Sequence, residues 1–178
     1  SGFTTTGYSV VNDVESLPKS LLFWRSSTHF IGGLGVIVFL LLVLPEASPF
    51  RLRMTNLELS SLSREGYRYR SSRTVWIICL VYLSLAVVET LLLWAAGMSL
   101  FDAINHSFST IATGGFSTRN ASIAYFDSRI IEAIIIFFMV ISGMHFGLIF
   151  HFATTGSFKV FKNPVARFYL GTIAVMTV

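Results

Sequence analysis

Long apolar runs alternate with short polar segments along this chain. An apolar run of about 20 residues crosses the roughly 30 Å hydrocarbon core of a bilayer as a helix, which satisfies its own backbone polar groups. Three runs reach this length, at residues 26–44, 74–94 and 130–152, and a fourth begins near Phe168. The pattern therefore predicts an all-α integral membrane protein.

A shorter amphipathic segment lies between the second and third runs. Ser99, followed three residues later by Asp102, is a variant of the capping box that begins helices. The apolar residues that would share one face of this helix are Leu100, Phe101, Ile104 and Phe108. A helix of about 11 residues is too short to cross the bilayer, and the flanking crossings must run antiparallel. We therefore expect a re-entrant loop made of a short helix, a glycine-containing turn and an extended return.

Two sequence phrases recur at nearly constant spacing. SGFTTTGY at 1–8 aligns with STIATGGF at 109–116, so that Gly7 falls on Gly115. FIGGLG at 30–35 aligns with VISGMH at 140–145, so that Gly33 falls on Gly143 after a small difference in loop length. Because both similarities occur in the same order, they indicate an internal repeat and a pseudo-symmetric bundle of helices.

Composition supports the membrane assignment. With 53% hydrophobic and 12% charged residues and a mean hydropathy of +0.70, the chain is too apolar for a soluble domain of its length. The net charge of +4 does not indicate nucleic acid as a partner, because the basic residues lie mainly between the apolar runs. The lone Cys79 excludes a disulfide framework and a paired-cysteine metal site.

The basic residues also predict the orientation of the chain. They concentrate in the linker 46–73 and in the loop before the fourth run, which should therefore face the cytoplasm. These residues are Arg51, Arg53, Arg64, Arg68, Arg70, Arg73, Lys159, Lys162 and Arg167. The linker could also bind anionic lipid or a cytoplasmic partner. Both copies of the glycine turn then face the periplasm or the outside.

The residue types in the repeated turn suit a desolvated cation. Backbone carbonyls can replace the hydration water of the ion without adding net charge. Glycine adopts the left-handed dihedrals that such a turn requires, and threonine hydroxyls can add oxygens or brace the turn. A short helix that ends just before the turn directs its partly negative end toward the ion.

These segments resemble the Trk/Ktr/HKT superfamily of potassium transporters, closest to the Trk-type membrane subunit. The resemblance rests on SGFTTTG, WRSSTHFIGGLGVIVF and FDAINHSFSTIATGGFST and covers nearly the whole chain. It implies four units of membrane helix, pore helix, filter loop and membrane helix around one central pore. The residues it places at the ion are Thr5, Thr6, Gly7, Thr113, Gly114 and Gly115, supported by Thr4, Tyr8, Ala112 and Phe116.

The same resemblance implies how the chain is divided, as a piece of a longer protein. Residues 1–8 would end the first pore loop, 9–45 would hold an outer loop and the second helix of repeat 1, and 46–73 would be a cytoplasmic linker. Repeat 2 would occupy 74–153, with a membrane helix at 74–97, a pore helix at 99–110, a filter at 111–116 and a membrane helix at 130–152. Residues 154–178 would start repeat 3.

The resemblance further implies potassium uptake across the bacterial inner membrane, with K⁺ as the transported ion and no organic cofactor. It implies a homodimer on nucleotide-binding regulatory subunits in the cytoplasm, surrounded by membrane lipid. A sodium- or proton-coupled symporter of the same superfamily is the alternative. A filter glycine, where some members have serine and admit sodium, favours potassium. The residues form no catalytic constellation, so we expect no enzyme; a structural or signalling membrane protein is the alternative of another class.

Several residues allow two interpretations. Gly32, Gly33 and Gly35 suit close helix packing, and Gly97 suits a helix cap.

Glu89 and Glu132 could attract cations to the pore mouth. Alternatively, they could pair with outer arginines, namely Arg25, Arg119 and Arg129. The four histidines lack the spacing of a zinc site, which favours packing roles for His29, His106, His145 and His151. The sequons that begin at Asn105 and Asn120 are interpreted as chance.

Overall fold

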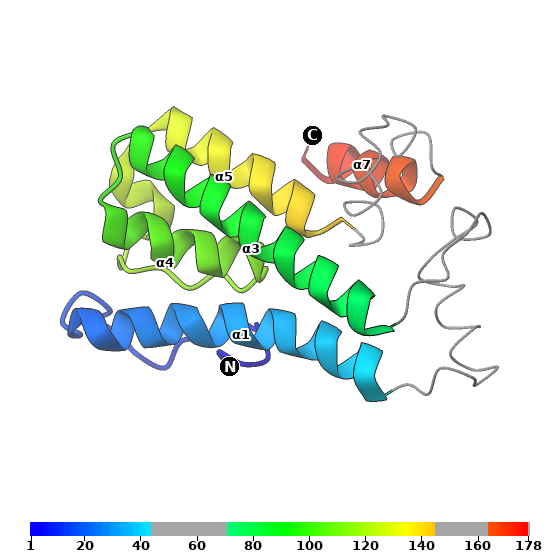
Figure 1. Cartoon of the computed structure of the whole chain (residues 1–178). Coiled ribbons are helices and arrows are strands. Elements are labelled where there is room, and N and C mark those ends of the chain that lie inside the picture. The colour runs from blue at the N-terminus through cyan, green and yellow to red at the C-terminus, as the bar shows by residue number, and fades with distance from the viewer. Residues whose placement is uncertain (44–70, 145–163, 178) are drawn as a thin grey trace. The chain divides into compact units, whose positions relative to one another are not determined.

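The computed structural model describes residues 1–43, 71–144 and 164–177, which form helices joined by turns (Figure 1). The chain divides into two compact units. The first contains Ser1–Ile37 and Tyr82–Gly143, and the second contains the described parts of Val38–Val81 and Met144–Val178. Within the described ranges all regular secondary structure is helical, which confirms the predicted all-α fold.

Helix α1 spans Lys19–Val43 and begins earlier than the apolar run that starts at residue 26. Pro18 precedes it, and the backbone N–H of Leu21 donates to the Pro18 carbonyl at 2.9 Å. Proline suits this place because its ring fixes φ near the helical value and its missing N–H would have no partner in the first turn. The apolar pattern missed this first part because it contains Lys19 and Arg25.

Helix α3 spans Ser71–Ala95 and ends at a glycine. Gly97 has φ 101°. Its N–H donates to Trp94 O at 3.0 Å, and the N–H of Met98 donates to Leu93 O at 3.1 Å. This pair of bonds is a Schellman motif, so the prediction that Gly97 caps the helix is confirmed. Among the described residues, the segment Trp76–Ala95 is long and apolar enough to cross a bilayer by itself.

Helix α4 spans Leu100–Ile111, and its start confirms the predicted cap. The Ser99 hydroxyl accepts a hydrogen bond from the Asp102 N–H at 3.1 Å. The four residues of the predicted apolar face are not buried in this helix: Leu100 is 51% exposed, and the other three are partly exposed. The buried residues of α4 are instead mostly polar: Asp102, Ala103, Asn105, His106, Ser107, Ser109 and Ile111. Polar groups turn inward in this helix because their hydrogen-bond partners lie there.

Neighbouring helices surround α4 within the first unit. The ring of Phe108 stacks on Phe30 of α1 with centroids 4.5 Å apart, and the Ser107 hydroxyl donates to the Ala86 carbonyl of α3 at 2.7 Å. The Ser142 hydroxyl of α5 donates to the Thr110 carbonyl at 3.2 Å. The short helix is therefore enclosed by other helices, as a re-entrant helix requires.

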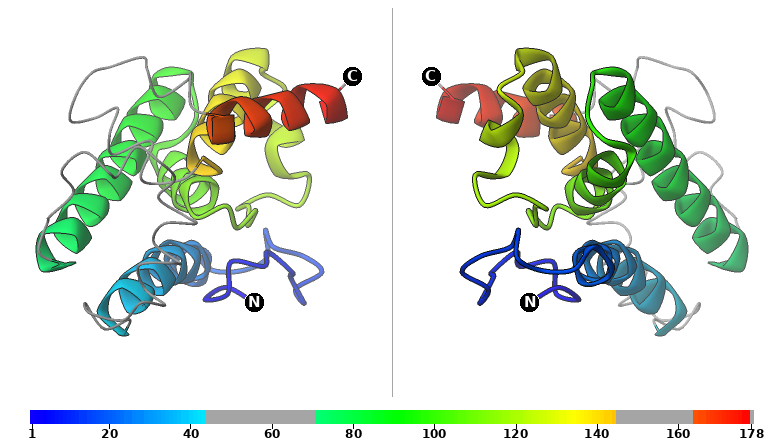
Figure 2. Two further views of the ribbon diagram at one scale, coloured as in Figure 1. Left: turned by 90° about the vertical axis from the view of Figure 1, so that its right-hand side faces the viewer. Right: turned by 90° about the vertical axis from the view of Figure 1, so that its left-hand side faces the viewer.

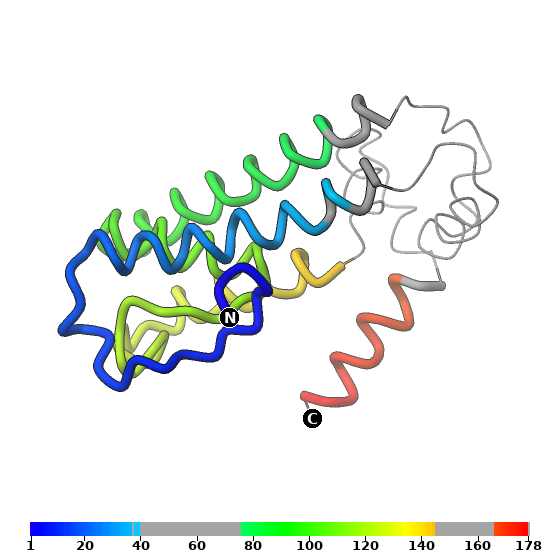
Figure 3. Tube along the Cα trace, turned by 90° about the horizontal axis from the view of Figure 1, so that it is seen from below, coloured from blue at the N-terminus to red at the C-terminus, as the bar shows by residue number. Residues whose placement is uncertain are grey.

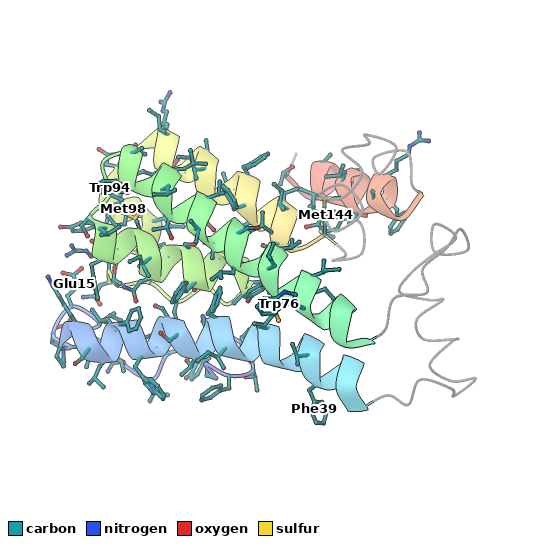
Figure 4. All side chains as sticks on the ribbon, viewed as in Figure 1. Glu15, Phe39, Trp76, Trp94, Met98 and Met144 are labelled. Carbon is teal, nitrogen blue, oxygen red and sulfur yellow. The ribbon has the colours of Figure 1, made fainter. Side chains whose placement is uncertain are left out.

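The return from α4 passes through a 3-10 helix, η2 (Ser122–Phe126), to α5 (Arg129–Ser142). The sequence did not predict η2, and residues 145–152 of the expected third crossing lie outside the described residues. A hydrophobic core joins these elements and comprises Leu93, Met98, Ala103, Ile131 and Ile135. Glu15, Trp94 and Met98 lie at the same end of the first unit (Figure 4).

The second unit includes α7, which spans Pro164–Thr177 and so begins before the predicted Phe168. Met144 and Ala166 are buried there, and Tyr169 packs against them. The expectations for most of the arginine-rich linker, and those for His145 and His151, fall at 44–70 and 145–163, outside the described residues.

Candidate functional site

The two glycine turns have the same alternating backbone. Thr5 and Gly7 have φ of 52° and 72°, and Thr113 and Gly115 have φ of 54° and 86°. Thr6 and Gly114, which lie between them, are not left-handed. A threonine in the left-handed region is uncommon because its branched side chain crowds the backbone. The alignment of the two sequence phrases thus has a counterpart in the dihedral angles.

The hydrogen bonds of the two turns repeat at the same aligned positions. In the second copy, the N–H groups of Thr113 and Gly114 donate to Thr110 O at 2.9 Å and Ser109 O at 2.8 Å. In the first copy, Thr5 and Thr6 donate to Gly2 O at 3.0 Å and Ser1 O at 3.1 Å. Each pair has the hydrogen-bond pattern of a Schellman motif, which in the second copy closes the end of α4. The two filter-like turns therefore share both their backbone hydrogen bonds and their φ pattern.

The two turns lie directly against each other. A Cβ placed on Gly7 would overlap the carbonyl oxygen of Gly114, so only glycine fits at this contact. The chain following each turn runs beside the other copy (Figures 2 and 3). Here the Asn120 amide accepts from the Val14 N–H and donates to the Asp13 carboxylate, both at 2.8 Å. The bond from Asn120 lowers the pKa of Asp13.

The remaining predicted site residues are placed differently in the two copies. In the first, the hydroxyls of Thr4 and Thr6 are 2.8 Å apart, and Tyr8 is 71% exposed. In the second, Ala112 and Phe116 are both buried, at 4% and 9% exposure. The aromatic residues that align in the repeat thus have different environments.

Asp102 holds the segment that follows the second turn. Its carboxylate accepts hydrogen bonds from the hydroxyls of Thr118 at 2.6 Å and Ser99 at 2.8 Å, and Arg119 lies 3.3 Å away as an ion pair. Burial works to raise the pKa of Asp102, but the Thr118 and Ser99 bonds and the Arg119 charge outweigh it and lower the pKa. The start of the pore helix is thereby fastened to the end of the turn.

His106 also connects the pore helix to the chain that follows the second turn. Burial lowers its pKa, which keeps the ring neutral near pH 7. Nδ1 lies 2.8 Å from the Asp102 carbonyl, which can only accept, so this nitrogen carries the proton. Nε2 then accepts from the Ser117 hydroxyl at 3.0 Å. Both nitrogens are satisfied, which confirms the predicted packing role.

Glycines of α1 allow the two turns to approach this helix. A Cβ on Gly32 would overlap the Phe3 carbonyl, and one on Gly33 would lie 2.7 Å from Tyr82 Oη and 3.3 Å from Ala112 Cβ. Gly35 differs, because no described atom lies within 4 Å of its added Cβ. The packing prediction is confirmed for Gly32 and Gly33, and the described residues give it no support for Gly35.

The acidic residues correct another expectation. Glu89 is completely buried, and its carboxylate lies beside Thr110. Among the described residues, the ion pair that forms joins Arg119 to Asp102. Glu89 therefore has no ion-pair partner in this part of the chain. Pairing of Glu89 with an outer arginine is therefore wrong: the pore helix, not the interface, covers this side chain. Glu132 is exposed on the first turn of α5.

The first sequon lies inside the protein. Asn105 is 1% exposed and Ser107 is fully buried, and the Asn105 amide donates to the Phe101 carbonyl at 2.7 Å. Interpretation of this sequon as chance is confirmed, because the asparagine is not accessible. Asn120 of the second sequon instead joins the chain segments that follow the two turns.

Sequence reasoning did not predict the partners of Asp102, the bridge at Asn120, or the residues of α1 behind the second turn. Asp102 had a local signal as a capping residue, but Thr118 and Arg119 reach it only through the fold. Together these contacts surround two backbone turns that are partly exposed. Such an arrangement can present fixed carbonyl oxygens to a cation, which is cargo rather than a resident cofactor.

Comparisons with known proteins agree with this architecture. A family model described as "TrkH: Cation transport protein" matches residues 1–172. The Trk system potassium uptake protein TrkH of Salmonella typhimurium is 41% identical over 180 residues, covering 100% of this chain and 37% of that protein. TrkH of Escherichia coli K12 is 42% identical over 173 residues, covering 96% of this chain and 36% of that protein.

A solved structure has the same fold. The potassium transporter TrkH from Vibrio parahaemolyticus superposes with a TM-score of 0.76 at 37% identity, covering 95% of this chain and 34% of that one. The chain therefore spans just over a third of the length of these relatives. With a family match over nearly its whole length and a matching all-α membrane fold, the chain belongs to the TrkH family of cation transport proteins.

Proposed function

We propose that this chain forms two of the four filter loops of a potassium-uptake protein of the bacterial inner membrane. The observation that carries the proposal is the paired backbone of the turns. Left-handed residues alternate with others at Thr5 and Gly7 and again at Thr113 and Gly115. Such alternation turns successive peptide groups so that like backbone atoms face one side. We infer that these atoms are the carbonyls, because the N–H groups of Thr5, Thr6, Thr113 and Gly114 already donate to earlier carbonyls of the chain.

The chemistry of the surroundings supports a cation. The pore helix α4 ends at Ile111, immediately before the turn, so its partly negative end is directed toward the candidate site. The ion-binding residues in this proposal are Thr5, Thr6, Gly7, Thr113, Gly114 and Gly115. Groups of carboxylate, histidine or cysteine side chains that could hold a metal are absent from the described residues. Backbone oxygens therefore supply the proposed ligands.

The proposal extends to the assembled protein. The names of the relatives describe potassium uptake, and the arginine-rich linker at 46–73 suits a cytoplasmic surface that meets anionic lipid or a regulatory subunit. We place the filter turns on the periplasmic side and expect a homodimer with a nucleotide-binding partner. Co-purification of the full-length protein with such a partner, lost on neutralising the linker arginines, would support this arrangement.

The test of the proposal uses cells that lack potassium uptake. The full-length protein containing this chain, and its Gly115→Ser variant, are compared in potassium-limited growth and in rubidium uptake. We expect the parent to restore both and the variant to lose potassium selectivity at equal membrane abundance. A parent that restores neither would favour a structural or signalling protein, and equal behaviour of both forms would remove Gly115 from the ion path.

A further inference from the structure

A histidine of the first repeat lies directly behind the second turn. His29 of α1 is completely buried, and its Nδ1 lies 3.2 Å from the Ser109 hydroxyl at the end of the pore helix. Its ring stacks on Phe116 with centroids 3.9 Å apart and planes 16° apart. One side chain thus contacts the residues on both sides of the turn 110–115.

The same ring explains why residue 114 is glycine. A Cβ built on Gly114 would overlap the Nδ1, Cε1 and Cγ atoms of His29. The backbone of Gly114 is not left-handed, so its dihedral angles alone would admit any residue. Gly115 is the opposite case, because it has φ 86° while no described atom lies within 4 Å of its added Cβ. One glycine is required by a close approach and the other by its conformation.

The first repeat provides an internal comparison. Thr6 falls on Gly114 when the two phrases are aligned, and it carries a full side chain. Thr6 is exposed, and its hydroxyl contacts Thr4 rather than a ring. A side chain is therefore compatible with this turn where no histidine lies against it.

A second contact from α1 fixes the same aromatic residue. Arg25, one helical turn before His29, lies over the Phe116 ring with its guanidinium carbon 4.4 Å from the centroid. A guanidinium over an aromatic face is attracted by the negative potential of the ring, so this contact helps to hold the ring in place. Phe116 is consequently held by two residues of the neighbouring repeat.

We propose that His29 is a positioning residue that sets the location of the second filter turn, so that a helix of repeat 1 determines selectivity in repeat 2. The inference rests on the proposed function. The His29 ring packs directly against the Gly114 backbone. Its contacts to Ser109 and Phe116 keep the ring in this position. Removing the ring should let the Gly114 carbonyl shift away from the ion.

The test adds a methyl group at residue 114 and removes the ring at residue 29 in the full-length protein. Rubidium uptake, its KM, sodium competition and membrane abundance are measured for Gly114→Ala, His29→Ala and the double variant. We expect Gly114→Ala to lower kcat/KM about tenfold or more, as overpacking of a filled site does. The double variant should regain most of this loss, because the shortened side chain at 29 makes room for the new methyl group.

Three controls separate the proposed role from general destabilisation. Rubidium uptake by Gly115→Ala should not improve when His29→Ala is added. The alanine at 115 is disfavoured by the left-handed backbone, not by a clash with a neighbouring side chain. His29→Phe keeps an aromatic ring against Gly114 and should keep more potassium selectivity than His29→Ala. Ile31→Ala, at a site on α1 that is 53% exposed, should leave uptake unchanged.

The outcomes distinguish the inference from the function on which it rests. A parent that takes up rubidium, with a double variant no better than Gly114→Ala at equal abundance, overturns the role of His29 alone. The role is also overturned if His29→Ala lowers membrane abundance without altering KM or sodium competition. A parent that takes up no rubidium overturns both proposals.

Discussion

At the scale of single residues, the site is defined by backbone handedness. Four left-handed residues lie in two turns, and two of the four are threonines. Each such non-glycine residue costs about 1–3 kcal/mol, and strain of this kind is concentrated at functional sites. The Schellman bonds and the mutual contact of the turns are the features that hold these residues in place.

The loss of rubidium uptake on replacing Gly115 should depend on how well the new residue adopts left-handed dihedral angles, not on the size of its side chain. Its added Cβ meets no described atom within 4 Å, so the penalty comes from φ 86°. Asparagine tolerates the left-handed region, whereas valine does not. We expect Gly115→Asn to keep several-fold more rubidium uptake than Gly115→Val. Equal loss in both, at equal abundance, would contradict a conformational requirement.

The sequence predicted the correspondence of the two turns because the signal was local. Gly7 and Gly115 were located by a repeated phrase, and the same alignment reappears in the φ angles and hydrogen bonds. His29 was only expected to pack. Its relation to Gly114 could not be predicted, because the two lie in different repeats of the chain and only the tertiary fold brings them together.

At the scale of elements, the pore helix is held at both ends. Its first turn is joined to the returning chain through Asp102, Thr118 and Arg119, and its last turn closes in a Schellman motif. The sequence predicted the helix and its cap. It did not predict the buried polar face, because an apolar stripe usually faces a core and here faces neighbouring helices and the surroundings.

Asp102→Asn should weaken the unit and alter its pH dependence. The variant loses a charge-assisted network, and we expect it to be destabilised by about 1–3 kcal/mol at pH 7. The pKa of Asp102 is lowered by folding, so its contribution is complete above the unfolded pKa of about 3.9 and is lost as pH falls through the folded pKa. The thermal midpoints of parent and variant, measured in detergent, should therefore converge in acid.

The matched control is Asp127→Asn, because Asp127 is exposed and its left-handed φ of 40° suits asparagine. We expect its thermal midpoint to equal that of the parent at every pH. A difference between parent and Asp102→Asn that stays constant from neutral pH to acid would contradict the role assigned to the Asp102 charge.

Two glycines of α1 offer a prediction about helix packing. Gly33→Ala places a methyl group 2.7 Å from Tyr82 Oη and 3.3 Å from Ala112 Cβ. Overpacking of this kind costs about 1–3 kcal/mol, so the thermal midpoint should fall. Gly35→Ala meets no described atom within 4 Å and should leave the midpoint unchanged or higher. Equal midpoints for the two variants would show that Gly33 is not a packing contact.

At the scale of the whole molecule, the repeat brings two turns from distant parts of the chain into one place. The apolar runs and the recurring phrase predicted a pseudo-symmetric bundle of repeated units, and the family resemblance implied that their turns surround one pore. Helix limits were less accurate, since α1 begins at Lys19 and α7 at Pro164, ahead of the apolar runs. Prolines mark both starts, and charged residues at the membrane edge hide them from an apolar pattern.

Orientation is tested by labelling from one side of the membrane. In a full-length protein from which Cys79 and any other cysteines have been removed, a cysteine at Val10, which is 84% exposed, should react with an impermeant maleimide added to intact spheroplasts. A cysteine at Ser61, in the arginine-rich linker, should react only after permeabilisation. The reverse pattern would contradict the orientation inferred from the basic residues.

We infer that the paired turns select the ion. The most direct measurement is the ratio of potassium to sodium flux through the purified full-length protein in liposomes, for the parent and for Gly7→Ser, Gly115→Ser and Gly35→Ser. We expect the ratio to fall about tenfold or more for the two turn variants, which corresponds to about 1.4 kcal/mol of lost discrimination, and to be unchanged for Gly35→Ser. A ratio that is the same in all four proteins would contradict it.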